Sequence, residues 1–546
     1  MLSTMQDEPL SLATLLRYAT TVHGTARVTT WTPDGVDQMT FAELGHDAAR
    51  LAHALRALGI EEGDRVGSYL WNNRAHMTAY CAVPAMGAVL HTLNIRLAPQ
   101  QNVYIANHAG DKAVIVDGSL SAQFADVLPH LTSVRHVIVT SSGPVEFDAP
   151  AGVVIHRYED LLAAQPDEYD WPELDERAAA ASCYTSGTTG DAKGVMYSHR
   201  SIWLHSLQVC ATYGMALSPH DSALTIVPMF HAMAWGIPYA ALMAGASLVL
   251  PDRYLHAPDL VRLLAQERPT FAAAVPTIWI GVLDQLDRHP QDVTHLRNVV
   301  VGGSAVPPAL MDAFAERHGV DIIQAWGMTE TSPLGSLAWA PPTAEGDDAW
   351  RYRYTQGRLL PGVQARLVND RGEVQPWDGR SLGELEVRGP WVTGRYFAPE
   401  GTDAADPEKF GDGWLRTGDI GSITQDGYLS LTDRSKDVIK SGGEWISSVQ
   451  LENAVMAHPA VSEAAVIGVP DQVWDERPLV AVVLSDGAQV TPRDLRAHLT
   501  SSFAKWQLPE HWTFIDEVPK TSVGKFDKKQ LRAAFHDGTL EVTTLT

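Results

Sequence analysis

The sequence predicts a protein of the α/β class, with a large α/β domain followed by a smaller α+β domain. At 546 residues, the chain is too long to fold around a single hydrophobic core. Up to about residue 430, short β-branched runs alternate with longer amphipathic stretches, which is typical of layered α/β structure. A charge-dense segment at 433–437 then precedes a different order of elements. We therefore expect one domain over 1–433 and a second over 434–546.

One unit of the large domain illustrates this alternation. Residues 298–301 are expected to form a buried strand, and a glycine turn leads to a helix that begins at a pair of prolines and ends at Gly319. The next strand is expected at 320–325, with 326–330 as its exit loop. The apolar side of the helix comprises Leu310, Met311, Phe314 and Ala315. Ligands of such sheets bind beyond the carboxyl ends of the strands, so the glycine turn and the exit loop are candidate binding segments.

The small domain is predicted from five shorter elements. They are a helix at 448–457, strands at 464–469 and 479–484, a helix at 492–501 and a strand at 512–515. A segment of about 110 residues is within the usual size range of a domain.

Composition excludes several classes of function. The formal net charge of −24 repels nucleic acid and anionic membrane surfaces. Cys81, Cys183 and Cys210 lack the spacing of a disulfide framework or a zinc site, so we expect three buried thiols. The sequence has no leader pattern at its N-terminus and no apolar run long enough to cross a membrane. We therefore expect a soluble, cytoplasmic protein.

The most informative segment is 184–194, with the sequence YTSGTTGDAKG. Glycines let successive backbone N–H groups turn toward one anion, and hydroxyl and ammonium groups add further donors. These residues are Gly187, Gly190 and Gly194, the hydroxyl residues Thr185, Ser186, Thr188 and Thr189, and Lys193. A Walker loop needs four residues between its glycines and then Lys-Ser or Lys-Thr, which this segment lacks. We predict a phosphate-binding loop of another kind.

Four further motifs follow this loop. They are 326–330 (WGMTE), 414–419 (WLRTGD), 433–437 (DRSKD) and 519–525 (PKTSVGK). In order and spacing, the five motifs resemble the adenylate-forming enzymes, which include acyl-CoA synthetases, peptide-synthetase adenylation domains and luciferases. Three more segments look most like the medium- and long-chain fatty acid CoA ligases: 227–231 (VPMFH), 440–447 (KSGGEWIS) and 503–509 (FAKWQLP).

This resemblance implies an architecture and a reaction. The N-terminal domain is expected to contain layered α/β sheets plus a small barrel, and the small α+β domain to be mobile. ATP is expected to activate an apolar carboxylic acid as acyl-adenylate with release of pyrophosphate, and CoA then to take the acyl group with release of AMP. No nucleic acid and no membrane span are expected, and the long-chain relatives suggest a homodimer.

The resemblance also implies catalytic residues. Lys525 matches the adenylation lysine, although Lys528 and Lys529 nearby leave open a solvated basic tail. Glu330 and the hydroxyl of Thr185 match ligands of Mg²⁺, which prefers oxygen. Trp326 matches the aromatic residue that stacks on adenine, where tyrosine is usual. Asp419 matches the carboxylate that accepts the ribose hydroxyls.

The full ATP/AMP site implied by the resemblance comprises Thr185, Ser186, Gly187, Thr188, Thr189, Gly190, Lys193, Gly303, Ser304, Gln324, Ala325, Trp326, Gly327, Thr329, Asp419, Arg434 and Lys436. The implied acyl site comprises His231, Ala232, Met233, Trp235, Gly303 and Trp445. Lys440, Gly442 and Gly443 are expected to serve thioester formation after the small domain rotates about Asp433.

Several alternatives remain open at this point. His231 is equally compatible with a hydrogen-bonded core histidine. Ala192 replaces the usual proline of the phosphate loop, which leaves ATP affinity open. A carrier protein in place of CoA and a non-catalytic nucleotide- or acyl-binding protein are the alternative functions. The GxSxG pattern at 379–383 is rejected as a hydrolase site because a strand, expected at 384–387, follows it where a nucleophile elbow needs a helix.

Overall fold

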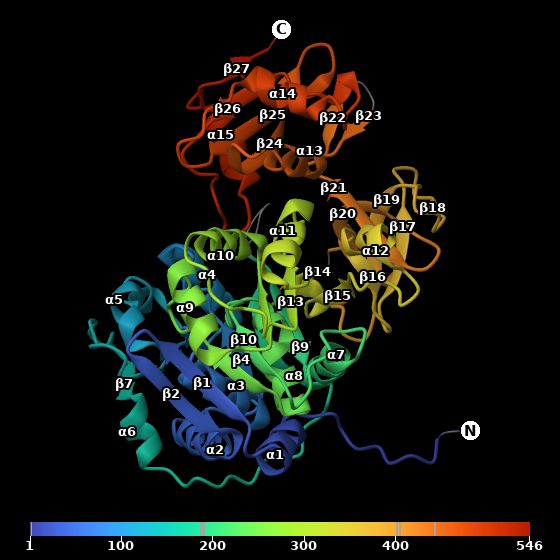
Figure 1. Ribbon diagram of the computed structural model, residues 1–546. Coiled ribbons are helices and arrows are strands. Elements are labelled where there is room, and N and C mark those ends of the chain that lie inside the picture. Colours follow the sequence, from blue (N-terminus) through green and yellow to red (C-terminus); the bar gives the residue numbers. More distant parts are fainter. Residues whose placement is uncertain are drawn as a thin grey trace.

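The computed structural model describes the chain except for residues 2, 186–191, 400–401, 403–405, 442–443, 523 and 546. Two large sheets lie together, and a smaller C-terminal sheet lies above them (Figure 1). Most of the phosphate loop and the glycine pair Gly442–Gly443 are therefore outside the described residues.

The first large sheet has seven strands. In spatial order they are β7 (Val154–Arg157), β6 (His136–Val139), β5 (Ala113–Val116), β3 (Arg65–Tyr69), β4 (Val89–Thr92), β8 (Ala179–Tyr184) and β9 (Gly194–Ser198). All neighbours are parallel except β8 and β9, which are antiparallel. Thr185 follows the carboxyl end of β8, and Lys193 directly precedes β9. The ends of the predicted phosphate loop are therefore fixed by this strand pair.

The second large sheet has fourteen strands and two halves. The parallel half contains β1 (Arg27–Thr32), β11 (Ser247–Leu250), β10 (Ser222–Thr225), β12 (Phe271–Ala274), β13 (Asn298–Gly302) and β14 (Ile322–Gly327), with β2 (Gly35–Thr40) antiparallel at its edge. The other half continues through β15 (Leu334–Leu337), β16 (Gly357–Leu359), β21 (Tyr428–Arg434), β20 (Leu415–Ile423), β19 (Gly383–Arg388), β17 (Gln364–Val368) and β18 (Val374–Gln375). Where the resemblance implied a small barrel, the described residues form this antiparallel extension.

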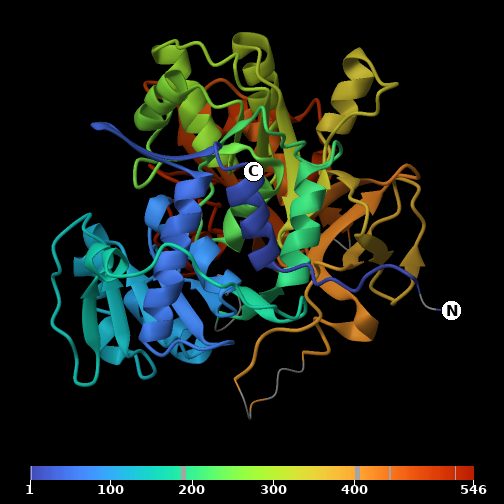
Figure 2. The same cartoon turned by 90° about the horizontal axis from the view of Figure 1, so that it is seen from below.

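Helices cover both faces of the two sheets, as Figures 1 and 2 show. One apolar core lies between the sheets and includes α1 (Leu12–Val22), α2 (Phe41–Ala57), α3 (Arg74–Ala85), α6 (Tyr158–Ala163), α7 (His199–Cys210) and α8 (Ile237–Ala244). The outer face of the large sheet packs on α9 (Ala257–Glu267), α10 (Pro276–Arg288) and α11 (Pro308–His318). The outer face of the seven-stranded sheet packs on α4 (Pro99–Ala109) and α5 (Ser121–Phe124). These alternating layers, with the short α12 (Gly346–Arg353) at the periphery, confirm the predicted α/β class.

The C-terminal part is the predicted α+β unit. Its strands are β22 (Ile439–Ser441), β23 (Glu444–Ile446), β24 (Val461–Asp471), β25 (Asp475–Leu484), β26 (His511–Phe514) and β27 (Thr543–Thr544), and its helices are α13 (Ser448–Met456), α14 (Pro492–Leu499) and α15 (Lys528–His536). β24 and β25 are longer than predicted because cross-strand pairing continues through polar residues to Asp471 and Asp475. Arg434 still pairs with Asp419 in the large sheet, so the boundary at 433/434 and the mobility of this unit stay predictions.

The unit around β13 closely follows the sequence prediction. α11 begins at Pro308, and Gly319 ends it with a left-handed φ of 65°. β14, however, extends through Trp326 and Gly327, which the sequence placed in an exit loop. The reason is antiparallel pairing with β15, in which Trp326 lies opposite Ser336. Gly383, the last residue of the GxSxG segment, begins β19, in agreement with the rejection of this segment as a nucleophile elbow.

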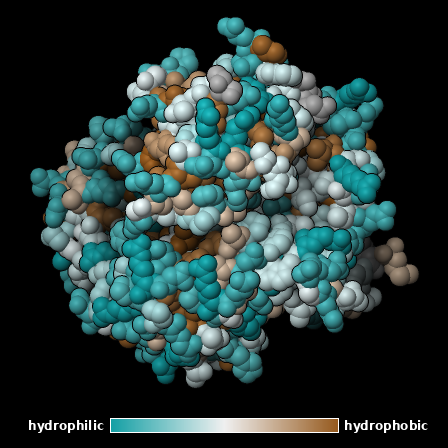
Figure 3. All heavy atoms as spheres, turned by 45° about the horizontal axis from the view of Figure 1, so that its top comes forward, coloured by the Kyte–Doolittle hydropathy of each residue, from teal (hydrophilic) through white to brown (hydrophobic). Residues whose placement is uncertain are grey.

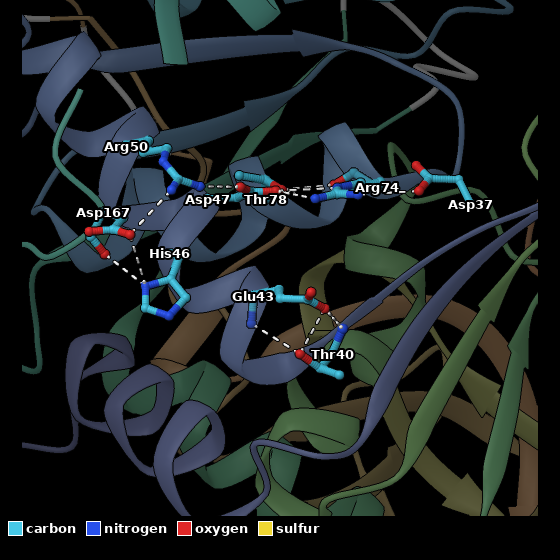
Figure 4. Close-up of polar contacts among 9 residues, drawn as sticks. All are labelled: Asp37, Thr40, Glu43, His46, Asp47, Arg50, Arg74, Thr78 and Asp167. Carbon is cyan, nitrogen blue, oxygen red and sulfur yellow. Dashed lines mark hydrogen bonds and ion pairs between the residues drawn. The ribbon is translucent and has the colours of Figure 1, made fainter. Parts of the chain in front are cut away.

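Polar contacts fix α2 at the edge of the large sheet (Figure 4). Thr40 and Glu43 form a capping box, in which the Glu43 N–H donates to Thr40 Oγ1 at 3.2 Å. The Arg74 guanidinium joins Asp47 of α2 at 2.7 Å and Asp37 of β2 at 3.2 Å. These contacts tie α2, α3 and β2 together.

The composition bears on the surface and on the cysteines. The face in Figure 3 is mostly hydrophilic, with apolar side chains in separate small patches. Within the described residues, no helix has both the length and the apolar character needed to span a membrane. Cys81 and Cys183 are buried free thiols, whereas Cys210 is only half-buried, which corrects the expectation of three buried thiols.

Candidate active site

A cavity of about 920 Å³ lies where the carboxyl ends of β8, β13 and β14 meet. Residues predicted from separate motifs line it together: Thr185, Lys193, His231, Ala232, Trp235, Gly303, Ala325, Trp326, Gly327, Thr329, Glu330, Arg434 and Lys525. Three elements far apart in sequence therefore converge on one space: a sheet edge, the antiparallel extension and the C-terminal unit.

A second cavity of about 290 Å³ adjoins the first. It adds the predicted residues Ser304, Asp419 and Lys436. Gly303, Trp326, Arg434 and Lys525 line both cavities, so the two spaces form one continuous site.

Trp326 and Asp419 are both buried, and their side chains are joined by a hydrogen bond. The indole Nε1 donates to Asp419 Oδ2 at 2.9 Å, and Arg434 Nε lies 3.3 Å from Asp419 Oδ1. Gly335 makes room for the indole, because a Cβ at Gly335 would lie 2.3 Å from Trp326 Cζ3. Trp326 is larger than the tyrosine that is usual at this position, and the glycine on the neighbouring strand β15 provides the extra space.

Glu330 is a buried carboxylate whose orientation is set by a residue that no motif contained. The Tyr396 hydroxyl donates to Glu330 Oε1 at 2.6 Å. The Tyr197 hydroxyl donates to the carbonyl of Thr329 at 2.8 Å and fixes the backbone of the same loop. Glu330 and Thr185 offer the oxygen ligands that Mg²⁺ prefers. Among the described residues, no group of three or more His, Cys, Asp or Glu side chains is arranged to hold a metal ion.

Lys193 lies at the mouth of the cavity beside Asp406. Their side chains form an ion pair of 2.7 Å, and the Lys193 ammonium lies 4.9 Å from the ring centre of Tyr396. The base of the phosphate loop is closed by the Thr185 N–H, which donates to the Lys193 carbonyl at 2.9 Å. Ala192 packs against the apolar core on the outer face of the seven-stranded sheet. Its effect on ATP affinity stays a prediction.

Lys525 approaches the site through a turn of the C-terminal unit. Gly303 has a φ of 87°, which favours glycine, and a Cβ there would lie only 3.1 Å from Lys525 Cε. Burial, together with the positive charge of Arg434, lowers the pKa of Lys525 to about 8, against the opposing influence of Asp419 and Glu330. The structure therefore places Lys525 within the site and not in a solvated tail.

The expected acyl wall has an unusual backbone. Ala232, Met233, Ala234 and Trp235 all have φ between 43° and 56°, and this left-handed turn costs about 1–2 kcal/mol per residue. Burial of all four side chains stabilises it. Ala232 and Trp235 line the cavity, whereas Met233 is a buried core residue that is not among those lining it.

His231 lines the same cavity and is half-buried. Burial and the nearby charges of Lys525 and Arg96 lower its pKa to about 3, so the imidazole is neutral at physiological pH. A neutral imidazole can donate one hydrogen bond and accept another.

Some predicted residues lie elsewhere. The Gln324 amide oxygen accepts from the Val306 N–H at 2.7 Å, and its nitrogen donates to the carbonyl of Thr355, so it supports the loop behind Gly303. Lys440 and Trp445 lie on β22 and β23 and are not among the residues that line either cavity. Ser186, Gly187, Thr188, Thr189, Gly190, Gly442 and Gly443 are outside the described residues.

The sequence missed Tyr396 and Asp406. Neither belongs to a motif, and only the folding of the segment after β19 against Glu330 and Lys193 places them in the site. No local pattern would have identified them.

The chain is similar to known proteins over nearly its whole length. The family model "AMP-binding enzyme" matches residues 17–397, and the model "AMP-binding enzyme C-terminal domain" matches 450–525. A 3-methylmercaptopropionyl-CoA ligase of Ruegeria pomeroyi is 41% identical, with 98% of this chain and 99% of the relative covered. A long-chain fatty acid CoA ligase of Thermus thermophilus is 44% identical, with 98% and 97% covered. The crystal structure of an anthranilate CoA ligase with anthranoyl-AMP superposes with a TM-score of 0.87 at 26% identity, covering 98% of this chain and 100% of that one.

Proposed function

The chain belongs to the AMP-binding enzyme family, and we propose that it is an ATP-dependent acyl-CoA ligase for an apolar carboxylic acid. Relatives that match almost the whole chain at 41% and 44% identity are CoA ligases, which supports this activity. The observation that carries the proposal is the convergence of Thr185, Glu330, Trp326, Arg434 and Lys525 on one cavity.

In the first step, a carboxylate oxygen of the acid attacks the α-phosphorus of ATP, and pyrophosphate leaves. The two reactants are anions, so positive charge must be placed where negative charge accumulates. Lys525 is proposed to bridge the carboxylate and the α-phosphate, and Arg434 to contact the nucleotide. Lys193 is proposed to release its ion pair with Asp406 and to bind the departing pyrophosphate instead.

The rest of the nucleotide is proposed to bind beside β14. Adenine stacks on Trp326, the ribose hydroxyls donate to Asp419, and Gly303 and Ser304 lie along the nucleotide. Mg²⁺, when bound, would neutralise phosphate charge, and Glu330 and Thr185 would hold it. Tyr396 keeps Glu330 oriented for that purpose.

In the second step, the CoA thiolate attacks the acyl carbon, the carbon–oxygen bond of the mixed anhydride breaks, and AMP leaves. We propose that the C-terminal unit rotates about Asp433 between the steps and brings the segment with Lys440, Gly442 and Gly443 to the site. Trp445 would then approach the acyl end.

The acid is proposed to lie along Ala232, Trp235 and Met215, whose side chains line the apolar part of the cavity. No carboxylate stands in the His231–Gly236 segment to receive an amino group, so an amino acid substrate is disfavoured. Specificity in such a pocket depends mainly on volume. Homodimeric assembly and a cytoplasmic location are further proposals based on the family resemblance.

A panel of straight, branched, sulfur-containing and alicyclic acids tests the proposal, with pyrophosphate release measured with and without CoA. We expect acid-dependent release and CoA-dependent formation of acyl-CoA. Acyl-adenylate without CoA turnover would favour a carrier protein as acceptor. No release with any acid would support a non-catalytic binding protein.

The variant Lys525→Ala separates the two steps. It is expected to lower acid-dependent pyrophosphate release to a small residual rate while retaining thioester formation from supplied acyl-adenylate. An equal loss of both steps would contradict the role proposed for Lys525.

A further inference from the structure

We propose that Asn94, Arg96 and Thr277 dock the turn to which Thr521, Ser522, Gly524 and Lys525 belong, and that they are positioning residues that hold Lys525 for the adenylation step alone. This inference rests on the proposed function, because it assigns these residues to one of its two half-reactions. In Figure 1, a loop of the C-terminal unit reaches down to the large domain beside α10, where these contacts are made.

Asn94 and Arg96 hold one side of the turn. They follow β4, and both contact Ser522: Asn94 Nδ2 donates to Ser522 Oγ at 3.0 Å, and Arg96 Nη1 donates to the Ser522 carbonyl at 3.2 Å. Asn94 is preoriented, because its Oδ1 accepts from the Arg96 N–H at 3.0 Å and its carbonyl accepts from Asn102 Nδ2 at 3.0 Å. The amide nitrogen is thereby directed at Ser522.

Thr277 holds the other side of the turn. Its hydroxyl, in the first turn of α10, donates to the Gly524 carbonyl at 2.9 Å. Gly524 has a φ of 82°, and a Cβ there would lie 3.2 Å from Thr277 Oγ1 and 3.3 Å from Val275 Cγ2. The glycine therefore permits the close approach that this hydrogen bond needs.

The turn is tied internally, so it moves as a unit. The Thr521 N–H donates to the Lys525 carbonyl at 2.7 Å, and the Gly524 N–H donates to the Thr521 carbonyl at 2.9 Å. The Lys525 N–H donates to Thr521 Oγ1 at 3.2 Å. Holding Ser522 and Gly524 in place thus holds Lys525 against Gly303.

These contacts belong to the arrangement in which Lys525 lies in the site. They connect side chains on two elements of the large domain to main-chain and side-chain atoms of the C-terminal unit. If the C-terminal unit rotates to admit CoA, all three contacts break. They can therefore favour pyrophosphate release without serving thioester formation.

The test compares Arg96→Met, Asn94→Ala and Thr277→Val in both half-reactions of the full chain. One reaction is acid-dependent pyrophosphate release, and the other is acyl-CoA formation from supplied acyl-adenylate and CoA. We expect Arg96→Met to slow the first about tenfold, and each of the other two to slow it about threefold, as expected for loss of single hydrogen bonds. The second reaction should change less than twofold, and Arg96→Lys should recover most of the loss.

Arg27→Met is the matched control, since Arg27 is an exposed arginine on β1 that donates to Gln38 at 2.8 Å. It should leave both reactions unchanged. Because Arg96 is itself exposed, Arg96→Met is expected to fold, and an unchanged melting temperature checks this.

A double variant distinguishes an effect of Arg96 on the position of Lys525 from a general effect of Arg96 on the enzyme. If Arg96 acts through Lys525, Arg96→Met combined with Lys525→Ala should release pyrophosphate no more slowly than Lys525→Ala alone. Equal slowing of both half-reactions by Arg96→Met, or full adenylation by all three variants, would overturn the inference. Failure of the wild-type protein to release pyrophosphate with any acid would instead overturn the proposed function.

Discussion

Trp326 and Asp419 are joined by a hydrogen bond of 2.9 Å from the indole nitrogen to the carboxylate. The residue proposed to stack on adenine therefore also orients the residue proposed to accept the ribose hydroxyls. A tyrosine or phenylalanine ring has no indole N–H to make this bond. Trp326 is thus proposed to combine two tasks, and its bulk is accommodated by Gly335.

Trp326→Phe is expected to raise the KM for ATP about tenfold, because it keeps an aromatic face but leaves a buried carboxylate with one donor fewer. The effect on the rate at saturating ATP should be smaller. Steady-state pyrophosphate release against ATP concentration measures this. Trp339→Phe is the control, since its indole donates to the Gly214 carbonyl at 2.8 Å. Equal KM values for ATP in the wild type and Trp326→Phe would show that the hydrogen bond has no role in binding.

The pH dependence of adenylation should follow Lys525. Its pKa is lowered to about 8, and only the protonated ammonium can bridge two anions. kcat/KM for pyrophosphate release is therefore expected to fall as pH rises through about 8, approaching tenfold per pH unit above it. Stopped assays between pH 6 and 10 would reveal this alkaline limb of the pH–rate profile, in which kcat/KM falls. The residual activity of Lys525→Ala should lack it, and the same limb in both proteins would assign the titration to another group.

Tyr396→Phe should weaken the binding of Mg²⁺. Loss of the hydroxyl removes the 2.6 Å hydrogen bond that orients the buried Glu330 carboxylate. We expect the Mg²⁺ concentration for half-maximal pyrophosphate release to rise about tenfold, on the scale of a hydrogen bond to a charged group.

Tyr197→Phe is the matched control for this variant, because that hydroxyl donates to the Thr329 carbonyl of the same loop and not to the carboxylate. It should shift the Mg²⁺ dependence little. Equal shifts in the two variants would indicate a general loosening of the loop.

Lys528 is expected to stabilise the C-terminal unit through a buried network. Its ammonium lies 2.7 Å from Glu452 Oε1 and donates to Ser448 Oγ at 2.6 Å, while Ser448 donates to Asp433 Oδ2. Lys528→Met would leave the buried Glu452 carboxylate without its cationic partner, which should lower the free energy of unfolding by about 3–5 kcal/mol.

Amide hydrogen exchange of β24 measures this cost, because the Val466 N–H donates to Glu452 Oε1 at 2.8 Å. Faster exchange is expected in Lys528→Met, with partial recovery in Lys528→Met combined with Glu452→Gln. Lys529→Met removes the neighbouring exposed lysine and should exchange like the wild type. Unaltered β24 protection in Lys528→Met would contradict the stabilising role.

The sequence predicted α11 closely because local signals define it: Pro307 precedes it, Pro308 begins it, Gly319 ends it, and one side is apolar. It missed β22, β23 and β27, which are two or three residues long and are defined by their pairing with other strands. It also placed Trp326 in a loop, because the pairing of β14 with β15 is not a local property.

The sequence by itself determined the fold class and the chemical groups available, since glycines, hydroxyls, carboxylates and lysines at fixed spacings define what each motif can bind. Only the tertiary structure decided which groups meet. Trp326 donates a hydrogen bond to Asp419, and Tyr396 donates one to Glu330. Arg96 donates one to Ser522, in the turn that carries Lys525 and more than four hundred residues away in sequence. The physical reason is that motif chemistry depends on residues close in sequence, whereas these contacts depend on how distant strands and helices pack.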